Sequence, residues 1–284
     1  MPDKPTWDQV AEFAAQLDDP AGGVSGICLR GLPGWGQNLA SLTTVINTFG
    51  GRWFDENWEP QLTAPETTAA VKFYVDLLQA HGQPDAAKDG WEGCLQQITQ
   101  GKTAMWYDDT VFAGSVLDQA TPEVKENIGF ALAPVKETEA SGWLWSWGLG
   151  ITASSKNKDA AWKFISWATS KDYIKLAGEK AGWDAIPPGS RTSTYEIPEY
   201  QEAANSYADL TLASINAADP NQPTIDPVPY TGVQYVQIPE FVDIGDYVSQ
   251  QVAGAISGSQ SVEEALQKSQ DYTTEVVTKA GYLK

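Results

Sequence analysis

The chain has 284 residues, with 37 acidic and 18 basic side chains and a formal net charge of −19 at pH 7. A chain of this length can form one large domain or two medium domains, each with its own hydrophobic core. The charge argues against nucleic acid or an anionic membrane surface as a partner, because no basic region could neutralise phosphates, and no segment approaches the ~20 apolar residues of a membrane span.

The first five residues lack the basic and apolar regions of a signal peptide. Either the protein is cytoplasmic or the chain starts downstream of its natural beginning. Thr6 and Gln9 then form a Thr-x-x-Gln capping box, which predicts the start of a helix. Apolar residues recur at helical spacing from Val10 to Leu17, so we expect this helix to be amphipathic.

Residues 26–29 are predicted to form a short buried strand that leads into a loop with three glycines and a proline, residues 30–38. Loops at strand ends commonly display binding groups. Arg30 is either a surface charge or a forked donor to ligand hydroxyls. We take Arg30, Trp35 and Asn38 as candidate ligand-binding residues.

Cys28 and Cys94 are the two cysteines of the chain. They form either one disulfide, which would close a loop of about 66 residues, or two small buried thiols. His81 is the only histidine, which removes His-based metal sites and argues against Ser-His-Asp or Cys-His catalysis. We therefore predict no metal site and no catalytic residue.

Several further elements are predicted before the middle of the chain. They are a helix over residues 39–49 that Gly50 and Gly51 end, a turn or hairpin over 52–60, a helix that begins near Pro65, a helix over 91–100 with Gly101 after it, and strands over 103–107 and 128–132.

Asp108 and Asp109 follow directly after the predicted strand 103–107. Adjacent carboxylates at a strand end can bind ligand hydroxyls, bind a cation or cap the following helix. All three roles fit the sequence, and we include Asp108 among the candidate ligand-binding residues.

Residues 142–151 carry three tryptophans at alternate positions, Trp143, Trp145 and Trp147. In an extended chain all three indoles point to one face. They form either a core strand or a ligand-binding surface. Indole rings pack against the C–H faces of sugars, so twelve tryptophans in an acidic chain favour carbohydrate binding.

The second half of the chain is predicted to be mostly helical, so that strands alternate with helices only in the first half, as in an α/β layered fold. The predicted helices cover residues 157–169, with Ala161, Phe164, Ile165 and Ala168 on the buried face, then 171–181, 243–256, and a helix that a Ser261–Glu264 capping box opens and that runs to about 279. A proline-rich, loop-like segment covers 220–239.

Six motifs then occur in a recognisable order: Pro5-Thr6-Trp7-Asp8, Gly26-Ile27, Gly50-Gly51, Gly101-Lys102-Thr103-Ala104-Met105, residues 157–164 and residues 258–266. Together they resemble family 1 extracellular solute-binding proteins, the maltose-binding-protein-like receptors of ABC importers. The resemblance runs from residue 5 to the C-terminus. Within that family, residues 27–36, 104–108 and 143–151 resemble the branch that binds sugar alcohols such as sorbitol and mannitol.

The resemblance implies an α/β fold like that of type II periplasmic binding proteins, with two lobes that close about a hinge on a ligand between them. It also implies N-terminal truncation, because members of the family carry a further stretch that supplies most of the N-terminal lobe. On this basis residues 1–147 belong to the C-terminal lobe, 148–190 to the N-terminal lobe, and 191–284 to the C-terminal lobe again. The middle section would then expose apolar helix faces.

The function that the resemblance implies is that of a periplasmic substrate-binding protein, which delivers a sugar alcohol or small sugar to the membrane permease of an ABC importer. The expected protein is a monomer without a cofactor, a nucleic-acid partner or enzymatic activity. The expected ligand-binding residues are those named above: Arg30, Trp35, Asn38, Asp108, Trp143, Trp145 and Trp147. Two alternatives are a glycoside hydrolase that uses a carboxylate pair, such as Asp108 with a distant Glu, and a lectin-like module without a transport role.

Overall fold

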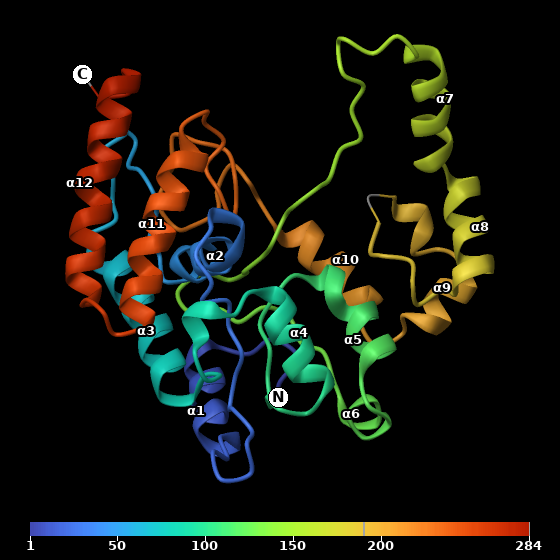
Figure 1. Ribbon diagram of the computed structural model, residues 1–284, viewed down its shortest axis with the longest axis horizontal. Helices are drawn as coiled ribbons and strands as arrows, with labels where there is room; N and C mark the ends of the chain where they lie inside the picture. The colour runs from blue at the N-terminus through green and yellow to red at the C-terminus, as the bar shows by residue number, and fades with distance from the viewer. Residues whose placement is uncertain (190, 284) are drawn as a thin grey trace. The chain divides into compact units, whose positions relative to one another are not determined.

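The computed structural model describes residues 1–189 and 191–283, and the chain divides into two compact units (Figure 1). Unit 1 comprises Met1–Asp109, Ala120–Leu144 and Ala213–Lys284, and unit 2 comprises Thr110–Gln119 and Trp145–Leu212. This division differs in its boundaries from the lobes expected from sequence, and the assignment of lobes stays a prediction.

Unit 1 contains the longest helices. Its elements are α1 (Trp7–Leu17), the π-helical turn η1 (Trp35–Leu39), α2 (Ala40–Thr48), α3 (Pro65–His81), the 3₁₀ turn η2 (Ala86–Lys88), α4 (Trp91–Thr99), α6 (Pro122–Asn127), α11 (Phe241–Ile256) and α12 (Val262–Ala280).

Unit 2 is built from shorter helices. Its elements are η3 (Thr110–Phe112), α5 (Ala113–Gln119), α7 (Lys158–Ala168), α8 (Lys171–Ala181), η4 (Thr192–Thr194) and α9 (Pro198–Ala203), while α10 (Ala208–Ala217) continues from unit 2 into unit 1. Among the described helices, none combines the length and the apolar character needed to cross a bilayer.

Two helices begin at the side-chain caps that the sequence predicted. Thr6 caps α1 in the predicted capping box, with the Thr6 hydroxyl accepting from the Gln9 backbone N–H and the Gln9 side chain accepting from the Thr6 N–H. The Ser261 hydroxyl accepts from the Glu264 N–H at the start of α12. The predicted helices therefore begin within a few residues of their expected positions.

The predicted strands are shorter than expected. The described backbone has isolated bridges in place of strands, and three of them join residues 25–28 in parallel to Gly82, Thr103 and Trp106. The strand predicted over 128–132 is wrong, because these residues have no regular secondary structure and the isolated bridge in this stretch lies three residues later, where Val135 bridges Thr6.

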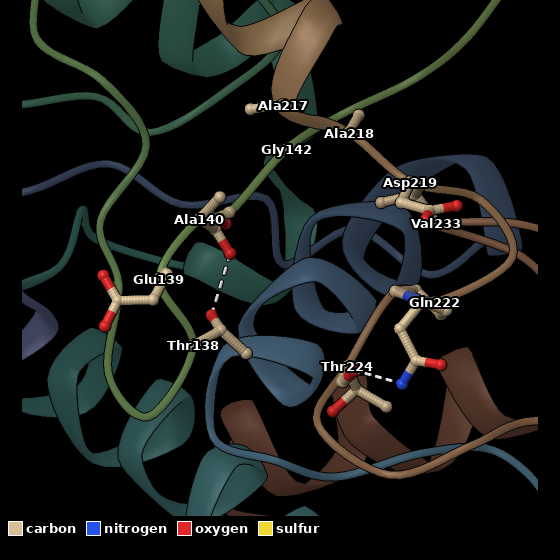
Figure 2. Close-up of a pocket in the computed structure, with 12 residues that line it drawn as sticks. Thr138, Glu139, Ala140, Gly142, Ala217, Ala218, Asp219, Gln222, Thr224 and Val233 are labelled. Atoms are coloured by element: carbon tan, nitrogen blue, oxygen red, sulfur yellow. Dashed lines mark hydrogen bonds between the residues drawn. The ribbon is translucent and has the colours of Figure 1, made fainter.

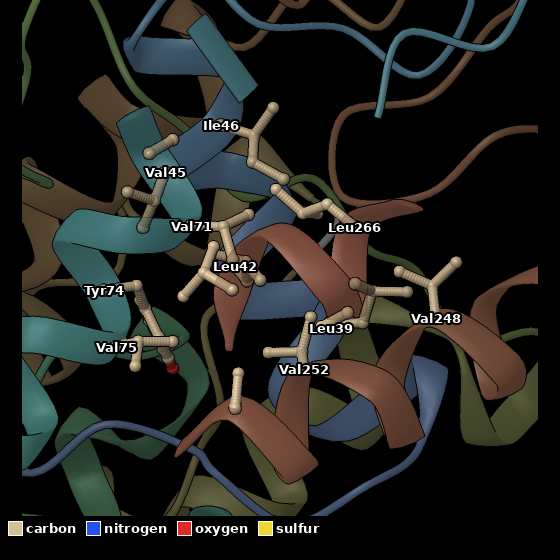
Figure 3. Close-up of a cluster of buried hydrophobic side chains, with 14 of the residues drawn as sticks. Leu39, Leu42, Val45, Ile46, Val71, Tyr74, Val75, Val248, Val252 and Leu266 are labelled. Carbon is tan, nitrogen blue, oxygen red and sulfur yellow. The ribbon is translucent and has the colours of Figure 1, made fainter. Parts of the chain in front are cut away.

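The core of unit 1 surrounds α2 (Figure 3). All nine residues of α2 are buried, including Thr44 and Asn47, and α2 packs against α3 and η1 in a buried cluster that also includes apolar side chains of α11 and α12. The polar groups of a helix buried on every side need hydrogen-bond partners within the protein. Some polar groups of α2 have them, whereas Ser41 Oγ and Thr43 Oγ1 have none among the described residues. The Thr44 hydroxyl donates to the Ser41 carbonyl at 2.7 Å, and Asn47 Nδ2 donates to the Val233 carbonyl at 2.7 Å.

A disulfide joins Cys28 to Cys94, which decides between the two roles that the sequence left open for these cysteines. Cys28 lies in the bridged segment that enters the 30–38 loop, and Cys94 lies in α4. The disulfide therefore fixes α4 against the segment that carries Arg30.

The helix pair α7–α8 of unit 2 exposes aromatic side chains. The prediction of a buried face on the helix over 157–169 is wrong, because no residue of α7 is buried, and Phe164 and Trp167 are 60% and 46% exposed. Their rings lie 6.1 Å apart, and Trp167 also contacts Tyr173 of α8 at 4.8 Å. The apolar pattern of this helix has no covering layer in the described chain, as the family resemblance implied.

We expect the double variant Phe164→Gln/Trp167→Gln to bind less of the dye ANS and to self-associate less than the parent chain. Its free energy of unfolding should change by no more than about 0.5 kcal/mol, as is usual for exposed positions. Fluorescence titration, analytical ultracentrifugation and urea unfolding measure the three quantities.

Val242→Gln is the matched control, because Val242 is an exposed apolar residue of unit 1 outside this aromatic group. It should leave dye binding unchanged. Equal dye binding by the parent chain and the double variant would contradict an accessible aromatic surface on α7.

Candidate functional site

The parallel pairing of two segments brings Arg30 and Asp108 together. Cys28 bridges Trp106, and the Cys28 N–H donates to the Met105 carbonyl at 2.8 Å. Residues two positions further along each segment lie on the same side of the paired backbone. Arg30 follows Cys28 by two and Asp108 follows Trp106 by two, so the register places the guanidinium beside the carboxylate.

The Arg30–Asp108 ion pair is buried and bidentate. Arg30 Nε donates to Asp108 Oδ2 at 2.8 Å, Arg30 Nη2 donates to Asp108 Oδ1, and both side chains are about 95% or more buried. Burial opposes the charge on Arg30, but the hydrogen bonds and the charge of Asp108 outweigh it and raise the pKa of Arg30. Both side chains of the pair are therefore charged, and their charges cancel.

Further hydrogen bonds hold the Arg30–Asp108 pair in place. Trp106 Nε1 donates to Asp108 Oδ2 at 3.0 Å, and the Asp109 N–H donates to Asp108 Oδ1 at 2.7 Å. Arg30 Nη1 donates to the Gly36 carbonyl at 2.9 Å, which attaches the 30–38 loop to the pair. Asp108 is thus not the surface carboxylate that a simple helix cap requires.

Trp143 packs against the same guanidinium. Arg30 Cζ lies 5.2 Å from the centre of the Trp143 ring, within the range of a cation–π contact. The Trp143 indole N–H is buried and, within residues 1–189 and 191–283, has no hydrogen-bond acceptor. A buried donor without an acceptor is costly, and a bound hydroxyl oxygen could satisfy it.

The 30–38 loop is held against α11. The Trp35 N–H donates to Asp246 Oδ1 at 2.9 Å, and Gly245 lets the loop approach, because a Cβ at that position would lie 2.7 Å from Trp35 Cβ. Asn38 is fully buried, and its Nδ2 donates to the Gly31 carbonyl at 3.2 Å and to the Ser249 carbonyl at 3.1 Å. Asn38 therefore fixes the loop, whereas Trp35 is only partly buried.

Trp145 and Trp147 belong to unit 2, whereas Trp143 belongs to unit 1. The three do not form one face of a strand, because residues 142–151 have no regular secondary structure. Trp147 is 88% exposed, and its ring meets that of Trp145 edge-on at 5.6 Å. The contact of these two residues with a ligand stays a prediction.

Tyr107, the residue before Asp108, is anchored in the core of unit 1. Its hydroxyl lies 2.5 Å from Thr44 Oγ1 of the buried helix α2, and its ring packs edge-on against Trp7 at 4.9 Å. Burial raises the pKa of Tyr107 to about 12, so the hydroxyl stays protonated at neutral pH. The residue that precedes Asp108 is therefore partly buried and uncharged.

A cavity of about 190 Å³ lies next to the chain that enters the tryptophan-rich segment (Figure 2). Residues 138–142 line one side, and residues 217–219 and 222–224 with Val233 line the other. Its polar groups are largely bonded to the protein: Gln222 Nε2 donates to the Thr224 carbonyl at 2.8 Å, and Thr138 Oγ1 donates to the Ala140 carbonyl at 2.8 Å. None of the predicted site residues lines it, so we place the candidate site at the Arg30–Asp108 pair.

Two contributors to the site were not predicted. Trp106 stands two residues before Asp108, and this spacing in an extended segment is the signal that could have placed both side chains on one face. Gln234 hydrogen-bonds the backbone of Leu144, next to Trp143. A glutamine in a proline-rich loop carries no comparable signal in the sequence.

The model of the bacterial extracellular solute-binding protein family matches residues 2–175. The chain belongs to this family. A mannitol-binding protein of Pseudomonas aeruginosa is 45% identical over 285 residues, which cover 100% of this chain and 65% of the relative. A probable amino-acid ABC transporter periplasmic-binding protein of Sinorhizobium fredii is 26% identical, covering 98% of this chain and 58% of the relative.

Solved solute-binding proteins share the fold. An ABC transporter solute-binding protein of Agrobacterium vitis S4 with bound D-mannitol superposes with a TM-score of 0.94 at 49% identity, covering 100% of this chain and 68% of that chain. Maltose-bound MalE3 of T. maritima reaches a TM-score of 0.79 at 21% identity, covering 96% of this chain and 66% of that chain, and shows the fold alone. The fold is that of type II periplasmic binding proteins, and the chain spans about two thirds of the length of these relatives.

Proposed function

We propose that this solute-binding protein captures a sugar alcohol such as mannitol and serves as the receptor of an ABC importer. Two relatives that align with the whole of this chain support the ligand class: the P. aeruginosa protein is named for mannitol, and the A. vitis protein holds D-mannitol. In the whole receptor, ligand binding would favour a closed state through contacts available only there.

The observation that carries the proposal is the buried Arg30–Asp108 pair beneath Trp143. Because the two charges compensate each other, the site suits an uncharged ligand better than an amino acid or an organic acid. The face of the Trp143 ring can pack against the C–H groups of a ligand, and its buried N–H lacks an acceptor that a ligand hydroxyl could provide. A site built on such polar groups discriminates strongly against analogues that lack a hydroxyl.

The proposed contact residues in unit 1 are Trp35 and Trp143, with Arg30 and Asp108 as the polar platform. Trp145 and Trp147 are proposed as further aromatic contacts. Asn38 holds the loop from within the core and is proposed as a support for Trp35.

We propose a periplasmic location, the permease subunits of the importer as partners, and a monomeric receptor. The Cys28–Cys94 disulfide supports an oxidising compartment. We propose no enzymatic activity: both oxygens of Asp108, the carboxylate considered for a glycoside hydrolase, already accept hydrogen bonds from Arg30 and one also from Trp106, which leaves neither oxygen free for a glycosidic bond.

Titration calorimetry of the full chain with mannitol should show saturable binding, and Trp143→Ala should weaken it at least tenfold, or about 1.4 kcal/mol. Trp162→Ala, at an exposed position of α7, is the aromatic control and should leave the affinity unchanged. Aryl glycosides should yield no product. An unchanged mannitol affinity in folded Trp143→Ala, or turnover of a glycoside, would overturn the proposal.

A further inference from the structure

We propose that Gln234 is a positioning residue that fixes Trp143 over the Arg30–Asp108 pair, an inference that rests on the proposed function for its role in ligand binding. The side chain of Gln234 hydrogen-bonds the backbone of Leu144. Its effect would pass through the backbone of Leu144, the residue after Trp143.

The amide of Gln234 pairs with both peptide groups of Leu144. The Leu144 N–H donates to Gln234 Oε1 at 3.3 Å, and Gln234 Nε2 donates to the Leu144 carbonyl at 2.9 Å. This is the donor–acceptor pattern that a neighbouring strand would supply. Because residues 142–151 have no strand partner, the side chain of Gln234 takes the place of one.

Gln234 can hold the backbone because it is itself held by the core. It is 1% exposed, and the carbonyl of the preceding residue, Val233, accepts from Asn47 of the buried helix α2 at 2.7 Å. Thr224, on the same loop, donates its hydroxyl to the Asn47 carbonyl at 3.0 Å. Asn47 thus fastens the loop at two points.

The turn before Gln234 is sterically determined. Gly232 has a φ of +137°, and a Cβ there would lie 2.0 Å from the Tyr235 carbonyl oxygen, so only glycine fits. The Gly232 N–H donates to the Pro220 carbonyl at 2.7 Å, and the Gln237 N–H donates to the Thr231 carbonyl at 2.9 Å. The loop therefore presents Gln234 in one defined position.

The contacts form an unbroken path from the core to the site. It runs from Asn47 through Val233 and Gln234 to Leu144, and its last step is the Trp143 ring, 5.2 Å from Arg30 Cζ. All of these residues lie in unit 1. Loss of the Gln234 amide should release residues 143 and 144 without removing any group from the Arg30–Asp108 pair.

The first test follows Trp143 directly and needs no ligand. The full chain is labelled with 5-fluorotryptophan, and the ¹⁹F resonance of Trp143 is assigned with Trp143→Phe. Gln234→Met keeps the length of the side chain and loses both hydrogen bonds. It should shift or broaden the Trp143 resonance and leave those of the core residues Trp7 and Trp53 in place.

Gln222→Met is the matched control. Gln222 is an amide of the same loop, but it donates to the loop carbonyls of Thr224 and Ile225 and not to residues 143–144. It should leave the Trp143 resonance unchanged. If Gln234→Met does not fold, Gln234→Leu takes its place, because it also loses both hydrogen bonds and buries no charge.

The second test measures mannitol affinity in a double-mutant cycle. Gln234→Met should weaken binding by about tenfold in the parent chain and by less than twofold in the Trp143→Ala background, because the two changes act through one indole. Additive effects would overturn the positioning role. So would an unmoved Trp143 resonance, or equal shifts of Trp143, Trp7 and Trp53. Absence of mannitol binding in the parent chain would defeat the proposed function alone, since the ¹⁹F result would still decide the role of Gln234.

Discussion

Asp108→Ala is expected to lower the free energy of unfolding by about 3–5 kcal/mol, because it leaves the charge of Arg30 buried without a partner. Arg30 is 4% exposed, and its guanidinium cannot turn to solvent without breaking its bond to the Gly36 carbonyl. Urea unfolding followed by circular dichroism measures the change. A loss below about 1 kcal/mol would show that water or another group reaches Arg30, contrary to the buried pair described above.

Asp76→Ala provides the control, because the Lys72–Asp76 pair is exposed on α3 and should contribute too little to resolve. The double variant Arg30→Met/Asp108→Leu separates stability from function. Replacing both charges with apolar groups should restore most of the lost stability but should abolish mannitol binding. Restored binding in that variant would remove the pair from the proposed site.

Reduction of the Cys28–Cys94 disulfide should lower the free energy of unfolding by about 4 kcal/mol, the chain-entropy expectation for a cross-link between residues 66 apart. Both cysteines are fully buried, so the loss should appear as a lower urea midpoint when the protein is unfolded and refolded in the presence of a reductant.

The double variant Cys28→Ala/Cys94→Ala is the control for this experiment. It should match the reduced parent chain and should not respond to reductant. A parent chain whose midpoint is the same with and without reductant would contradict a stabilising role for this disulfide.

Local features of the fold could be predicted from the sequence. The Thr6–Gln9 capping box and the Ser261 cap act within four residues, so the residues that form them are adjacent in the printed sequence. The spacing of apolar residues also predicted the helix over 157–169, but it did not predict that the apolar face of this helix is exposed. Periodicity shows which face is apolar and does not show whether another layer covers it.

Contacts between distant segments could not be predicted in the same way. The sequence singled out Arg30 and Asp108 separately, but their pairing depends on the register of two segments 78 positions apart. The pairing of Cys28 with Cys94 likewise depends on where α4 packs. The strand expected for the three tryptophans failed because strand formation needs a partner, and here Gln234 supplies only a side-chain amide.

The parallel bridge between Cys28 and Trp106 has a consequence for how this protein can change over evolutionary time. Arg30 and Asp108 meet because each stands two residues beyond the bridge, on the same side of its segment. Inserting or deleting one residue on either side would turn one charge to the opposite face. The stretches 28–30 and 106–108 should therefore vary in residue type before they vary in length, whereas the loops around them can lengthen or shorten freely.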